Sequence, residues 1–89
     1  MAEISVESTE TDEGWRFDVR VAEGVSESRH EVTLSRADRD RIAGGAELAE
    51  LIRESFAFLL EREPKESILG SFDLTVIARY FPEYERAMA

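Results

Sequence analysis

The chain of 89 residues contains no cysteine, asparagine or glutamine, and it has a single histidine. The lack of cysteine excludes a disulfide scaffold, a cysteine-ligated metal site and a cysteine nucleophile. No stretch approaches the ~18 apolar residues of a membrane span. The N-terminus MAEISVE also lacks the basic and apolar regions of a signal peptide. We therefore expect a cytoplasmic protein with no membrane association, no cofactor and no bound metal.

Positive charge is scarce, because 11 lysines and arginines stand against 20 aspartates and glutamates, a formal net charge of -9. Such a chain repels phosphate unless cations gather locally, so we expect no nucleic-acid partner. The one local cluster consists of Arg36, Arg39 and Arg41, with Asp38 and Asp40 between them. Surface ion pairing is the expected role of these arginines, and contact with an anion stays open.

Hydrophobic residues make up 43% of the chain and charged residues 35%, which is a typical globular composition. A chain of this length supports one core that buries roughly 60–65% of the unfolded surface. We predict one small domain spanning residues 1–89.

Apolar and polar residues alternate in three runs of the first third of the chain, within residues 4–7, 15–21 and 30–34. Period-two alternation is typical of antiparallel strands with one solvated face. Short turn-like segments, 11–14 and 23–26, connect the runs. The pattern predicts a three-stranded antiparallel meander with the second run in the centre.

Helical patterns follow. A short helix is predicted near residues 36–43, where Ser35 and Asp38 resemble a capping box and Gly44-Gly45 ends the segment. A long helix is predicted from Ala46 to about Glu63, before Pro64.

The C-terminal segment predicts a further helix after Asp73, which Pro82 ends or kinks before a fresh helical start. The fold class is therefore α+β: a three-stranded antiparallel meander packed on one face by a long helix and a C-terminal helix, with a short helix after strand 3.

The apolar side of the long helix covers roughly 200°, whereas packing on a sheet needs a stripe of about 100° or slightly more. The residues on this side are Leu48, Leu51, Ile52, Phe56, Phe58, Leu59 and Leu60. The excess predicts a second packing partner, which the C-terminal helix can supply. Because that helix is itself apolar on most sides, we also expect a homodimer through the C-terminal region.

An aromatic stripe contributes to the candidate interface, although such a stripe more often belongs to the core. The stripe consists of Phe56, Phe58, Phe72, Tyr80, Phe81 and Tyr84. One small sheet cannot bury all six, and tyrosine is favoured as an interface anchor. The candidate interface is Val76, Tyr80, Phe81 and Tyr84.

Other polar groups suit structural roles. His30 falls on the apolar face of its strand, and no nucleophile or metal-ligand spacing surrounds it. Arg16, Asp18 and Arg20 alternate on the outer sheet face, where mixed charges suit cross-strand ion pairs. We expect neither an enzyme nor a small-molecule ligand.

The segments ESFAFLLEREPKESIL and FDLTVIARYFPEYE resemble a group of short bacterial proteins to which no activity is assigned. The resemblance spans roughly residues 15–86; it implies a compact bacterial domain and no site residues. A looser likeness, in strand–strand–strand–helix order only, is to HicB-type antitoxins. The glycine- and proline-rich motif that typically follows their hairpin is missing here, and we expect no appended DNA-binding segment.

Two functions remain. The first is a non-enzymatic protein-interaction or homo-oligomeric accessory domain that docks through the candidate interface. The alternative is an acidic, antitoxin-like inhibitor of a basic toxin or nuclease. Strongly salt-dependent association favours the inhibitor, and salt-insensitive self-association favours the oligomer.

Overall fold

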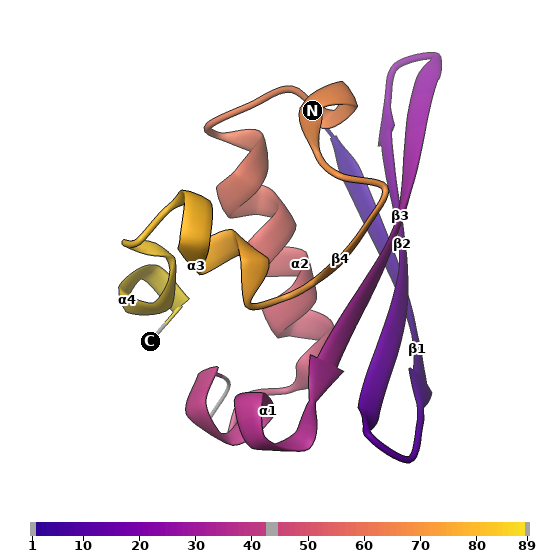
Figure 1. Cartoon of the computed structure of the whole chain (residues 1–89). Coiled ribbons are helices and arrows are strands. Elements are labelled where there is room, and N and C mark those ends of the chain that lie inside the picture. The colour runs from indigo at the N-terminus through magenta and orange to yellow at the C-terminus, as the bar shows by residue number, and fades with distance from the viewer. Residues whose placement is uncertain (1, 43–44, 89) are drawn as a thin grey trace.

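A computed structural model describes residues 2–42 and 45–88, and its central feature is a mixed sheet of four strands (Figure 1). The first three form the predicted antiparallel meander. The fourth pairs in parallel with the third, so the prediction of a three-stranded sheet was incomplete. In sheet order the strands are β1 (Glu3–Glu10), β2 (Gly14–Glu23), β3 (Ser26–Ser35) and β4 (Ser71–Asp73).

The sheet buries the face that the alternation predicts. On β2, Phe17, Val19 and Val21 are buried, while the residues between them face solvent. Gly14 begins β2 where the backbones of β2 and β3 approach closely, since a Cβ there would lie 2.0 Å from the carbonyl oxygen of Leu34. Only glycine fits at this position without a shift of the backbone.

Five helical segments follow the meander or flank β4. They are α1 (Arg36–Ile42), α2 (Leu48–Leu60), the 3₁₀ turn η1 (Lys65–Ser67), α3 (Val76–Tyr80) and α4 (Tyr84–Met88). The cap of α1 is confirmed, because the Asp38 N–H donates to the Ser35 hydroxyl at 3.1 Å. Of the predicted helix 36–43 and its glycine end, Ala43 and Gly44 lie outside the described residues.

The long helix is shorter than predicted, since α2 spans 13 residues and a turn occupies 61–63 before Pro64. The predicted C-terminal helix is divided into α3 and α4 on either side of Pro82.

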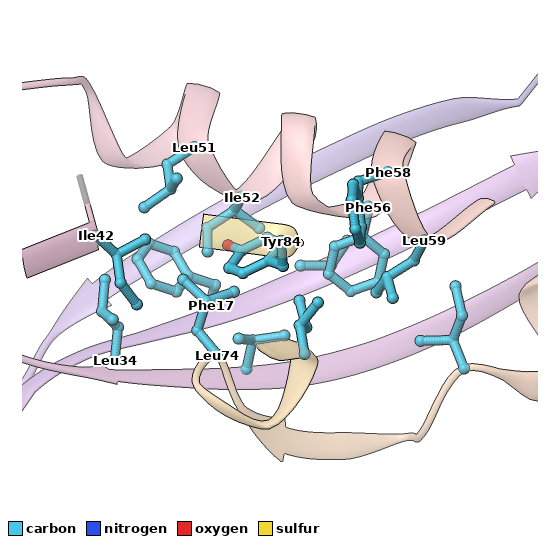
Figure 2. Packing of buried hydrophobic residues seen from close by; sticks show 14 of the residues in the cluster. Phe17, Leu34, Ile42, Leu51, Ile52, Phe56, Phe58, Leu59, Leu74 and Tyr84 are labelled. Atoms are coloured by element: carbon cyan, nitrogen blue, oxygen red, sulfur yellow. The ribbon is translucent and has the colours of Figure 1, made fainter. Parts of the chain in front are cut away.

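Helix α2 lies between the sheet and the α3–α4 pair (Figure 1). On its sheet side, Ile52 and Phe56 are fully buried. On the other side, the Phe58 ring meets the ring of Tyr84 edge-on, with centroids 5.4 Å apart (Figure 2). It also meets the Phe81 ring edge-on, with centroids 5.9 Å apart. The second packing partner predicted for the long helix is therefore confirmed, and it comes from the same chain.

Candidate functional site

An apolar groove opens beside α3, with a volume of about 250 Å³. We call it the α3 groove. It is lined by Leu59, Glu63, Ser67, Ile68, Leu69, Phe72, Val76, Ile77, Tyr80 and Phe81. Two of these are strongly exposed for large apolar side chains: Tyr80 at 70% and Leu69 at 50%. Among the described residues that line the groove, Glu63 carries the only formal charge.

The groove exists because the chain after α2 returns to the sheet through residues 61–70, which we call the return segment, and then reverses again. The Glu31 N–H donates to the Gly70 carbonyl at 2.8 Å, which draws this return segment onto β3. The segment continues as β4, where Phe72 pairs with Val32. Helix α3 then starts directly after β4, so its side chains lie beside the return segment and the end of α2.

Asp73 holds the turn between β4 and α3. Its carboxylate accepts hydrogen bonds from the Thr33 hydroxyl at 2.8 Å and from the hydroxyl and N–H of Thr75 at 2.6 and 3.1 Å. Partial burial opposes ionisation, but these hydrogen bonds and the nearby Arg79 outweigh it and lower the pKa of Asp73. The ionised carboxylate therefore stabilises the start of the helix that forms one wall of the groove.

Three of the four predicted interface residues, Val76, Tyr80 and Phe81, line the α3 groove together. The fourth, Tyr84, was wrongly placed at the surface, because it is fully buried. The chain reverses at Phe81–Glu83, so α4 folds back on α2 and its first residue points inward (Figure 2).

The Tyr84 hydroxyl shares a 2.6 Å hydrogen bond with the Ser55 hydroxyl, which also donates to the Leu51 carbonyl at 2.7 Å. Burial raises the pKa of Tyr84 to about 12, although the Ser55 hydrogen bond acts in the opposite direction. Tyr84 is therefore part of the core that supports the groove.

Sequence reasoning missed the contribution of the return segment. Ile68 and Leu69 line the groove beside Phe72 of the aromatic stripe, and Glu63 supplies its charge. The available signal was the pair Ile68-Leu69 just before Gly70, an apolar pair in a segment with no helical or alternating pattern. That signal marks a packed loop without telling which side chain stays exposed.

The outer face of the sheet carries like charges in rows. In the strand register Asp18 lies directly opposite Glu7 on one side and Glu31 on the other, and Arg20 lies opposite Arg29. The predicted cross-strand ion pairs are present, although not between directly opposed residues. They form diagonally and at the distance limit, for example Arg16 with Glu31 at 4.0 Å.

The cationic cluster of α1 is engaged within the chain. Arg36 donates to the Glu10 carboxylate at 2.9 Å and lies over the Trp15 ring, with its guanidinium carbon 5.1 Å from the ring centroid. Arg39 lies over the same ring and beside Asp40. Arg41 pairs with carboxylates of α1 and α4. This supports the expectation of surface ion pairing, and contact with an anion stays untested.

His30 is a buried side chain with partners for both ring nitrogens. Nδ1 lies 2.7 Å from the Leu69 carbonyl oxygen and Nε2 lies 2.8 Å from the Ser28 hydroxyl. Since a carbonyl only accepts, Nδ1 is the donor in the first bond. Its ring also packs against Phe56 at 5.3 Å. His30 therefore anchors the return segment beside the groove.

Within residues 2–42 and 45–88, no group of three acidic or histidine side chains is arranged to hold a metal ion. None of the helices in that part of the chain combines the length and apolar character that a membrane crossing requires. No family model matches the chain, and no curated protein or solved structure matches it significantly.

Proposed function

We propose that the protein is a non-enzymatic interaction module whose α3 groove binds a segment of another protein. The observation that carries the proposal is the exposure of Tyr80 and Leu69 at the margin of an apolar groove. Exposed tyrosine beside apolar side chains is the arrangement favoured at protein interfaces, where a rigid ring gives contact area at little entropic cost.

The size of the groove favours a peptide side chain over a small molecule. Pockets for drug-sized ligands have volumes of ≈ 300–1,000 Å³, whereas this groove has about 250 Å³. It suits one or two large apolar side chains from a partner. The partner's remaining contacts would then fall on the exposed surface around the groove.

The negative charge of the groove and of the chain indicates which residue type the partner would carry beside its apolar anchor. Glu63 is the one formal charge among the described lining residues, and the chain as a whole carries -9. A basic residue next to the partner's apolar anchor would complement both. The proposed occupant is therefore a protein segment that presents a large apolar side chain beside lysine or arginine.

A selection from a random peptide display library tests this specificity. The wild-type protein should enrich peptides that combine leucine or an aromatic residue with an adjacent lysine or arginine. Glu63→Lys should move the adjacent preference to aspartate or glutamate and keep the apolar anchor. As a control, Glu54→Lys reverses an exposed charge of α2 that does not line the groove, and its selection should match wild type. Basic preference that persists in Glu63→Lys would contradict the proposal.

The inhibitor of a basic toxin or nuclease is the second candidate function. It is supported by the row formed by Glu7, Asp18 and Glu31, in which adjacent carboxylates repel one another. A basic surface laid on this row would relieve the repulsion. Binding of an oligolysine probe that weakens steeply with salt, and weakens further in Asp18→Asn but not in the loop variant Asp12→Asn, would favour this function.

A further inference from the structure

Strand β1 (Glu3–Glu10) forms one edge of the sheet, and in the described part of the chain no segment pairs with its outer side. The other edge is occupied by β4. Along these eight residues every second one leaves its backbone groups unpaired, which forms a ready template for another strand. This edge lies at the opposite side of the sheet from β4 and its groove, so it is independent of the proposed peptide site.

The hydrogen bonds of the β1–β2 turn show which residues of β1 direct their backbone N–H and C=O groups away from β2. Thr11 and Gly14 exchange both backbone hydrogen bonds, at 2.7 and 3.3 Å, and are therefore a hydrogen-bonded pair. Because such pairs alternate along an antiparallel ladder, the odd-numbered residues of β1 bond to β2. The even-numbered residues, Ile4, Val6, Ser8 and Glu10, direct their N–H and C=O groups away from β2.

The usual protection of an edge strand is weak here. The sequence EISVESTE has no proline, lysine or glycine, and the pairing with β2 runs without a bulge from one end to the other. Ile4 and Val6 are only half-buried on the covered face, so a neighbouring strand would bury more of both. The protective charges of the strand are its glutamates, which restrict the register of any added strand.

We propose that a second copy of this chain pairs with β1 in antiparallel orientation, across a two-fold axis at Val6. Side chains stay on their own faces only when odd residues oppose odd residues. In the register centred on Val6, Glu3 lies opposite Thr9 of the second copy and Glu7 lies opposite Ser5. Every carboxylate of the outer face therefore faces a hydroxyl.

Neighbouring registers are less favourable. A shift of two residues in one direction places Glu3 opposite Glu7, and a shift in the other direction places the two Glu7 side chains opposite each other. Like charges directly opposite destabilise a strand pair. The centred register pairs as many residues as the register with opposed Glu7 side chains and more than the other one, and its symmetry is that of a closed dimer. Because β1 is complementary to a second β1 in this register, we choose a second copy of the chain as the partner of this edge.

Two substitutions of opposite charge at Thr9 distinguish effects on dimer association from effects on the stability of the monomer. Within one chain Thr9 lies opposite Arg16 of β2, so Thr9→Glu should stabilise the monomer and Thr9→Lys should destabilise it. In the dimer Thr9 of each copy lies opposite Glu3 of the other copy, so this contact occurs twice. There Thr9→Lys should tighten association and Thr9→Glu should weaken it, each by about 2- to 30-fold in the dissociation constant.

Sedimentation equilibrium measures the dissociation constants, and urea unfolding at low protein concentration measures monomer stability. Ser8→Pro provides a second test, because it removes an outward N–H and leaves the bonds to β2 intact. We expect it to abolish the dimer, whereas Ser8→Ala should keep it. If Ser8→Pro does not fold, the dissociation constants of Thr9→Lys and Thr9→Glu still test the dimer.

Three results would overturn the proposal. One is a wild-type chain that sediments as a 10.1 kDa monomer at its solubility limit. Another is a dimer whose dissociation constant is the same in both Thr9 variants. The third is a dimer that Tyr80→Ala disrupts and the Thr9 variants do not, since this would place self-association at the α3 groove.

Discussion

At the scale of single residues, Tyr80 and Tyr84 have the same side chain and opposite environments. Tyr80 is 70% exposed at the end of α3, and Tyr84 is fully buried at the start of α4. In the sequence they differ little, since both stand in the same aromatic segment. The chain reversal around Pro82 separates them, and the direction of such a reversal depends on how α4 packs against α2. Sequence patterns therefore identified the aromatic segment without telling which tyrosine faces solvent.

Substitution Tyr84→Phe tests the buried hydrogen bond. Loss of the hydroxyl should lower the free energy of unfolding at neutral pH by about 0.5–1.5 kcal/mol, because Ser55 loses one partner. Urea unfolding followed by circular dichroism gives this value. A variant as stable as wild type would show that the bond contributes nothing.

The same variant tests the raised pKa of Tyr84. The unfolded chain releases the phenol proton near pH 10, and the folded chain holds it to about pH 12. This contribution to stability is thus complete below pH 10 and is lost as pH rises toward 12, by about 2–3 kcal/mol. Wild type should lose that much more stability than Tyr84→Phe between these pH values. Parallel curves for the two proteins would contradict the burial of the hydroxyl.

At the scale of elements, the three long strands could be predicted and β4 could not. Alternation within residues 4–7, 15–21 and 30–34 marks β1 to β3. The turn at Gly24 joins β2 to β3 with a glycine at a φ of 62°. Strand β4 has only three residues, too few for a period to show. Its parallel pairing depends on the return of the chain after α2, which is fixed by tertiary contacts such as the bond between His30 and the Leu69 carbonyl.

The turn between β4 and α3 carries a prediction of its own. Asp73→Asn should lower the free energy of unfolding at neutral pH by about 1 kcal/mol, because a neutral amide accepts these hydrogen bonds less strongly than a carboxylate. The pKa of Asp73 is lowered in the folded chain. Its contribution is therefore present above the ordinary aspartate pKa of about 4 and is lost as pH falls through the lower folded value.

The acid part of the unfolding curve measures this effect. The difference between wild type and Asp73→Asn should shrink as the pH falls below about 4. Asp12→Asn, in the exposed β1–β2 loop, is the control and should follow wild type throughout. A constant difference between wild type and Asp73→Asn at all pH values would contradict the role of the ionised carboxylate.

At the scale of the whole molecule, charge and apolar surface are separated. The strands and the outer side of α2 carry most of the acidic excess, whereas residues 64–89 hold four carboxylates against three cations. The apolar excess that first indicated a dimer is covered largely by α4 packing on α2 (Figure 2). The α3 groove stays uncovered, and Tyr80 is its most exposed large apolar residue. Composition predicted such a neutral region, and only the packing of α4 shows how much of it stays open.

The most direct test of the account is the affinity of one selected apolar-basic peptide for wild type, Tyr80→Ala and Val25→Ala, measured by isothermal titration calorimetry. Val25 is the matched control, because it is a fully exposed apolar residue at the β2–β3 turn and does not line the groove. Loss of an aromatic anchor costs about 2 kcal/mol, which corresponds to a fall in affinity of roughly 30-fold. We expect that loss for Tyr80→Ala and no change for Val25→Ala. Equal affinity for Tyr80→Ala and wild type would contradict it.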